Sequence, residues 1–114
     1  MSLDLTKIEK KAVAKVLLDI VNADRRITVG ESRYFQHLQN VLGISDSEIE
    51  EAKYLSVVGS LAIIKQMLPI EKQLLALMML EMINADGDVD SEEIKVFIAV
   101  CALAEIPLPE GVEK

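Results

Sequence analysis

The sequence is poor in the residues that build disulfides, zinc sites and nucleophilic active sites. Its 114 positions include one cysteine, one histidine and no tryptophan, and aromatic residues make up 4%. A single cysteine excludes an intramolecular disulfide and a cysteine-based zinc site, so Cys101 predicts a reducing compartment and therefore a cytoplasmic protein. With so little histidine and cysteine, carboxylates are the only abundant reactive groups.

Long apolar runs are missing as well. The longest, residues 74–80, is far shorter than the roughly 20 residues that span a bilayer. The first residues also lack the apolar segment and cleavage site of a secretion signal. We therefore expect a soluble protein that does not span a membrane.

Positive charge is scarce. Twelve lysines and arginines face nineteen aspartates and glutamates, which gives a net charge of −7. Binding to nucleic acid depends on basic side chains that neutralise phosphates. We therefore expect no nucleic-acid partner.

Apolar residues at helical spacing are plentiful, and 51% of the chain is hydrophobic. The pattern predicts helices over residues 4–23, 28–43, 45–53, 56–67, 70–85 and 90–105, with N-caps at Thr28, Ser45 and Asp90. No stretch shows the alternation typical of a strand. We therefore predict an all-α fold, a compact bundle of about six to seven helices that forms one domain over residues 1–114.

Two of these helices are apolar nearly all the way round, over residues 74–80 and 96–103. Such helices are typical of the centre of a bundle, so we expect Leu77 to lie in the core. Cys101 is expected to be a buried core residue, and His37 an exposed residue of an amphipathic helix.

The two halves of the chain resemble each other when they are shifted by 62 residues. The copies span about residues 4–45 and 70–107, and each reads as an apolar helix, Asn-Ala-Asp, a short turn and a second apolar helix. The matched residues are Leu18, Asn22, Ala23, Asp24, Glu31 and Phe35 in the first copy and Leu80, Asn84, Ala85, Asp86, Glu93 and Phe97 in the second. We predict two helical hairpins related by an approximate twofold axis.

The turns of the two copies differ in charge. A carboxylate at the C-terminal end of a helix opposes the macrodipole, so Asp24 and Asp86 each need a compensating partner. That partner is a backbone N–H group of the next helix, a basic side chain or a bound cation. Arg25 and Arg26 serve the first turn. The second turn has no such neighbour and gathers five carboxylates, those of Asp86, Asp88, Asp90, Glu92 and Glu93.

The second turn can be compared with an EF-hand loop, which wraps Ca²⁺ around a glycine at position 6. Placing Gly87 there puts side chains with oxygen atoms at positions 3, 5, 9 and 12, with Asn84 at position 3. Position 1 falls on Met82, which cannot bind a hard cation. Two interpretations stay open: a weak site for Ca²⁺ or Mg²⁺, and a purely structural turn.

These motifs resemble the TerB-like family, the tellurite-resistance proteins that are also related to the N-terminal domain of the co-chaperone DjlA. The segments that carry the resemblance are residues 21–24 with Glu31 and residues 83–93. The resemblance implies a bacterial cytoplasmic protein in a stress-response or membrane-associated complex. It also implies metal binding by Asp24 and Glu31 in the first motif and by Asp86 and Glu93 in the second.

The function that we expect is a non-catalytic TerB-like helical module that binds a protein partner, with a weak divalent-cation site at the second turn as one of the two open interpretations of that turn. One alternative is a small metal-dependent enzyme that uses Asp86, Asp88 and Glu93, although the sequence offers few further polar groups for an active site. The other is a structural subunit of an oligomer such as a homodimer.

Overall fold

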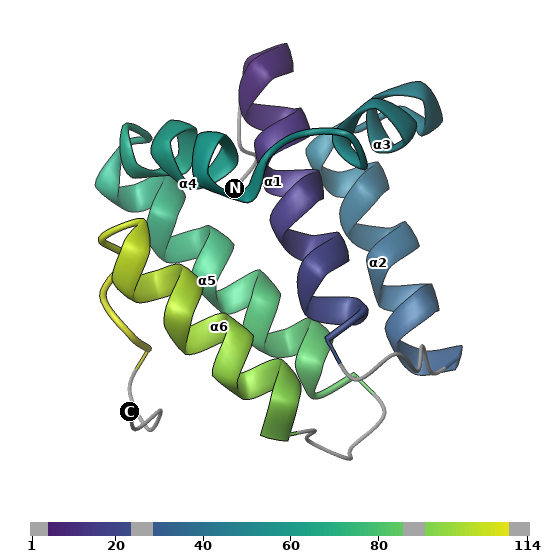
Figure 1. Ribbon diagram of the computed structural model, residues 1–114. Coiled ribbons are helices and arrows are strands. Elements are labelled where there is room, and N and C mark those ends of the chain that lie inside the picture. Colours follow the sequence, from purple (N-terminus) through teal and green to yellow (C-terminus); the bar gives the residue numbers. More distant parts are fainter. Residues whose placement is uncertain (1–4, 24–28, 86–90, 110–114) are drawn as a thin grey trace.

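Helices form most of the part that the computed structural model describes, which is residues 5–23, 29–85 and 91–109. They are α1 (Lys7–Val21), α2 (Val29–Leu42), α3 (Asp46–Ala52), α4 (Val57–Lys65), α5 (Pro69–Ile83) and α6 (Ser91–Leu103). No strand occurs within these ranges, and the predicted all-α fold class is confirmed. Figure 1 shows α1 and α5 in the middle of the bundle, with α2 beside α1, α6 beside α5, and α3 and α4 at the upper end.

Local side-chain signals set where these helices begin. The hydroxyl groups of Thr6 and Ser45 each accept a hydrogen bond of 3.1 Å from the backbone N–H three residues later. The glutamate at that later position accepts a bond of 2.9 Å from the backbone N–H of the cap in return. Both are capping boxes, and the prediction for Ser45 is confirmed. The other two predicted caps, Thr28 and Asp90, lie outside the described residues.

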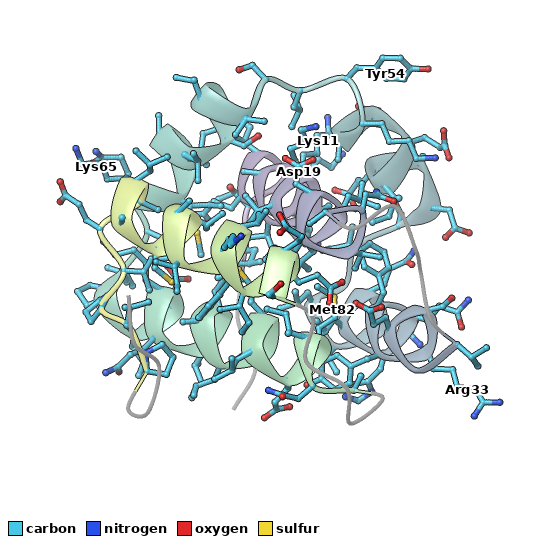
Figure 2. The ribbon with its side chains drawn as sticks, turned by 60° about the horizontal axis from the view of Figure 1, so that its bottom comes forward. Lys11, Asp19, Arg33, Tyr54, Lys65 and Met82 are labelled. Atoms are coloured by element: carbon cyan, nitrogen blue, oxygen red, sulfur yellow. The ribbon has the colours of Figure 1, made fainter. Side chains whose placement is uncertain are left out.

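The core is aliphatic, as the shortage of aromatic residues predicts. Its largest buried side chain, Phe97, is surrounded by leucine, isoleucine, valine and methionine. Cys101 is buried among them, as expected. Figure 2 shows Met82 in the interior, whereas Tyr54, Arg33 and Lys65 point away from the bundle.

Helix α5 corrects one prediction. Its buried residues are Leu75, Ala76, Met79, Met82 and Ile83. Leu77 is 48% exposed instead of lying in the core. Successive residues of a helix are about 100° apart, so a run of seven apolar residues surrounds the axis, and the pattern does not say which face meets the core. The core takes one face of α5, and Leu77 lies on another.

The repeat predicted from the sequence is present in the arrangement of the helices. The 62-residue shift relates α1 to α5 and α2 to α6. Helix α1 packs against α6, α5 packs against α2, and the two equivalent helices α1 and α5 also contact each other. An approximate twofold axis that relates α1 to α5 and α2 to α6 turns the contact of α1 with α6 into the contact of α5 with α2, as observed.

The bundle has a radius of gyration of 12.8 Å and extents of 32 × 29 × 27 Å. These are the dimensions of a compact domain of about 100 residues. Over the ranges given above, no helix is both long and apolar enough to cross a membrane.

Candidate functional site

The residues predicted to bind a metal fall mostly outside the described parts of the chain. Asp24, Asp86, Asp88 and Asp90 all lie there. Within residues 5–23, 29–85 and 91–109, His, Cys, Asp and Glu side chains form no group of three or more that could hold a metal ion. The structure therefore leaves the predicted site at the second turn untested.

Glu31 and Glu93 are the two predicted metal-site residues that the structure describes. They occupy matched positions in the first turns of α2 and α6, and they are only 2% and 1% exposed. Neither residue is without an interaction partner. Burial of a carboxylate is costly unless it is partnered, so both side chains are held as parts of the interior.

The asparagines of the two Asn-Ala-Asp motifs have a local role. The amide nitrogen of Asn22 donates to the backbone oxygen of Leu18 at 2.9 Å, and that of Asn84 donates to the backbone oxygen of Leu80 at 2.8 Å. Both asparagines are helix C-caps with nearly the same backbone angles. The EF-hand comparison placed Asn84 at a ligand position, but capping accounts for this asparagine without a metal ion.

The candidate site is a groove between α2 and α5, which the sequence did not predict. Its volume is about 660 Å³, within the range of small-ligand pockets. The residues that line it are Gly30, Arg33, Tyr34, His37, Leu77, Leu80, Glu81, Asn84 and Ala85. The half-exposed Leu77 therefore belongs to its wall.

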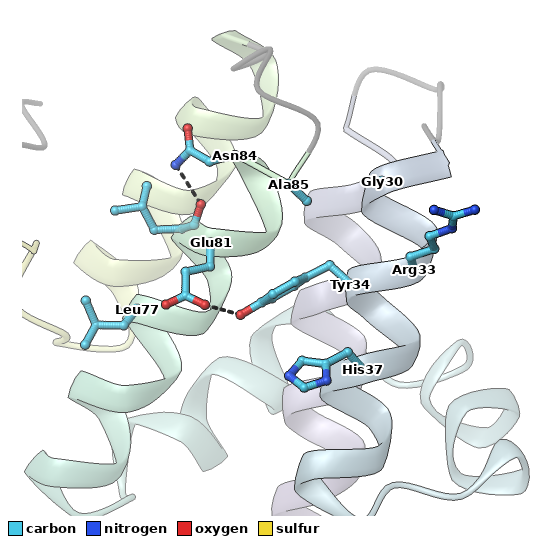
Figure 3. Close-up of a pocket in the computed structure, with 9 residues that line it drawn as sticks. Gly30, Arg33, Tyr34, His37, Leu77, Glu81, Asn84 and Ala85 are labelled. Atoms are coloured by element: carbon cyan, nitrogen blue, oxygen red, sulfur yellow. Dashed lines mark hydrogen bonds between the residues drawn. The ribbon is translucent and has the colours of Figure 1, made fainter.

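A hydrogen bond crosses the groove. Figure 3 shows Tyr34 reaching from α2 towards α5, where its hydroxyl group donates to Oε2 of Glu81. Partial burial of the ring, together with the neighbouring Glu81 carboxylate, raises the pKa of Tyr34 to about 12. The hydroxyl group therefore stays protonated at neutral pH and is a fixed donor.

The other polar groups of the groove come from α2. The ring of His37 lies 5.6 Å from that of Tyr34, between centroids, at a tilt of 52°. His37 is exposed, as the sequence predicted, but it lies in the wall of the groove. Arg33 points away from α5 in Figure 3. The groove therefore combines apolar side chains with a carboxylate that has a neutral donor as its partner.

A second hollow, of about 360 Å³, lies between the starts of α1 and α3 and is lined by Lys7, Lys10 and Lys11. Its acidic groups offset these lysines. Lys11 pairs with Glu51 at 2.7 Å. The pKa of Glu48 is lowered chiefly by the N–H of the helix cap and further by the other two lysines. This hollow is a less distinct candidate than the groove because two glutamates already offset most of the charge of its three lysines.

Cys101, the single thiol, is not suited to nucleophilic chemistry. It is buried, and desolvation raises its pKa to about 11. A thiol with this pKa is almost entirely protonated at neutral pH, whereas the thiolate is the reactive form.

The sequence carries one indication of the groove. The repeat places Leu77 in register with Lys15, so an apolar residue stands where the other copy has a charged one. Nothing local pairs Tyr34 with Glu81, because they are 47 residues apart and meet only through the packing of α2 on α5.

Comparisons with known proteins give the fold and no function. The sequence matches no protein-family model and no curated protein. Its structure is similar to the crystal structure of PG1108, a protein of unknown function from Porphyromonas gingivalis W83. The TM-score is 0.81 with 21% sequence identity, and the match covers 94% of this chain and 90% of that one. The six-helix arrangement of the described residues thus occurs in a solved structure.

Proposed function

We propose that the protein is a non-catalytic helical module that binds a protein partner through the groove between α2 and α5. The observation that carries this proposal is the 48% exposure of Leu77 in the wall of a groove of about 660 Å³. An apolar side chain beside a concave surface is the usual basis of helix and peptide recognition. The resemblance to TerB-like proteins supports placing the module in a bacterial cytoplasmic stress-response or membrane-associated complex.

A photo-crosslinking amino acid at position 77 tests this proposal in the cells that produce the protein. In place of Leu77, the probe lies in the groove wall, and we expect it to form crosslinks with one or a few proteins. The matched control carries the same probe in place of Glu50, an exposed residue of α3. Equal crosslinking from both positions, or none from position 77, would contradict the proposal.

The weak divalent-cation site at the second turn stays a prediction with its own test. A cation that binds only the native state raises stability with its concentration. We expect millimolar Ca²⁺ or Mg²⁺ to raise the melting temperature relative to EDTA, and Asp86→Asn to remove this effect while Asp24→Asn keeps it. An unchanged melting temperature in the unmodified protein favours the purely structural turn.

A further inference from the structure

The repeat provides an internal comparison for the groove. In the first copy, Lys15 forms an ion pair with Asp19 on the next turn of α1, at 3.1 Å. The equivalent residues of α5 are Leu77 and Glu81. The carboxylate is kept in the second copy, and the lysine that neutralises it is replaced by a leucine.

Tyr34 does not substitute for this lysine. It donates a hydrogen bond to Glu81, but a hydroxyl group that stays protonated carries no charge. Arg33, the arginine of the groove wall, points away from α5. Among the described residues, no lysine or arginine pairs with Glu81 in the way that Lys15 pairs with Asp19.

The same face of the two helices also differs in what covers it. On α1, both α3 and α4 pack against the helix, and Lys11 reaches Glu51 of α3 at 2.7 Å. The side chain of Lys15 is only 16% exposed. On α5 the equivalents of these two lysines are Gln73 and Leu77, and both are exposed. Helix α5 thus presents to solvent the face that short helices cover on α1.

This face is hollowed on both sides of Leu77. One side is the groove with α2, and the other is a hollow of about 400 Å³ bounded by residues 107–109 of the C-terminal segment. Leu77 lines both. A ridge between two hollows fits a helix whose side chains enter on either side, as in helix-in-groove recognition.

From these observations we infer that the occupant of this face is a basic amphipathic helix of a protein partner, with an arginine or lysine that pairs with Glu81. Its apolar side chains pack against Leu77, and its cation takes the place that Lys15 has beside Asp19. The net charge of −7 favours such a partner over a second copy of this chain. This inference rests on the proposed function, because it specifies the partner of the same groove.

A display library of amphipathic helical peptides tests the inference. The peptides have about five turns, carry randomised residues on both faces, and are selected on the unmodified protein at physiological salt. We expect the selected peptides to combine apolar residues with an arginine or lysine. Affinities are then measured for Glu81→Gln, for Leu77→Lys, which restores the pattern of the first copy, and for Asp19→Asn as the matched control.

We expect Glu81→Gln and Leu77→Lys to weaken binding at least tenfold and Asp19→Asn to leave it unchanged. Glu81→Gln keeps an acceptor for Tyr34, and Leu77 is half exposed, so both variants should fold; thermal melts check this. Replacing the basic residue of a peptide by glutamine should weaken its binding to the unmodified protein and have no effect on its binding to Glu81→Gln.

The outcomes separate the two proposals. The inference of a basic partner is wrong if the selected peptides bind through Leu77 but carry no basic residue, or if they bind Glu81→Gln as tightly as the unmodified protein. Either result leaves the proposed function uncontradicted. A failure to select any peptide that is sensitive to Leu77→Lys contradicts both. If the protein instead forms a dimer that Leu77→Lys dissociates, the occupant is a second copy and the inference is wrong.

Discussion

At the scale of single residues, the repeat shows where the chain is strained. Gly43 and Glu105 occupy matched positions after α2 and α6, and both have left-handed backbone, with φ of 68° and 56°. In each case the N–H of the following isoleucine donates to a carbonyl group five residues back, at 2.9 and 2.8 Å. This is the Schellman ending of a helix, which favours glycine. Glu105 adopts this left-handed conformation although it has a Cβ atom, which disfavours it.

Glu105→Gly should therefore stabilise the protein. Removing the Cβ atom from a left-handed residue relieves about 1 kcal/mol, and the exposed ion pair of Glu105 with Lys65 contributes little in return. Glycine is also freer in the unfolded chain, which offsets part of this relief, so we expect the free energy of unfolding, measured with urea, to rise by about 0.5 kcal/mol. The matched control Gly43→Ala should lower it by a similar amount, and a loss of stability in Glu105→Gly would contradict this account.

Tyr34 predicts a dependence of stability on alkaline pH. Its pKa is raised from 10.0 to about 12 in the folded protein. The folded state thus favours the protonated form, and the stabilising contribution is complete below pH 10 and is lost as the pH rises from 10 to 12. Between these pH values, the unfolding free energy of the unmodified protein should fall more than that of Tyr34→Phe. Tyr54→Phe, at an 88% exposed position, is the control and should keep the slope of the unmodified protein.

At the scale of helices, short-range sequence signals predicted well where helices begin and end. They predicted only in part which face of each helix is buried. Ser45 caps its helix as predicted, and the helix before it is followed by Gly43, the last residue of the predicted range 28–43. Both effects act within a few residues, so sequence alone specifies them. The orientation of α5 could not be predicted, because leucine and methionine surround the helix and its packing partners are distant in sequence. The pairing of Tyr34 with Glu81 was missed for the same reason.

The orientation of α5 can be tested by truncating two neighbouring leucines. Leu75 is 1% exposed and Leu77 is 48% exposed. We expect Leu75→Ala to lower the unfolding free energy by about 2–5 kcal/mol, through lost burial and a residual cavity, and Leu77→Ala by less than about 1 kcal/mol. Chemical denaturation of both variants measures this difference. Equal losses would mean that Leu77 lies in the core.

At the scale of the whole molecule, helices of the two copies of the repeat pack against each other. Helix α1 of the first copy contacts α5 and α6 of the second, and α2 contacts α5. Neither hairpin therefore buries its apolar faces alone. A domain whose halves share one core is expected to unfold in a single cooperative step.

Cys101 is a built-in reporter for this cooperativity. It is the single cysteine, it is buried in α6, and desolvation raises its pKa to about 11, so the folded protein should not react with thiol reagents at neutral pH. If α6 opens only when the whole bundle unfolds, the free energy of opening from thiol labelling will equal the unfolding free energy from circular dichroism. Labelling that reports a value several kcal/mol lower would show that α6 opens by itself, and the prediction of one cooperative domain would then be wrong.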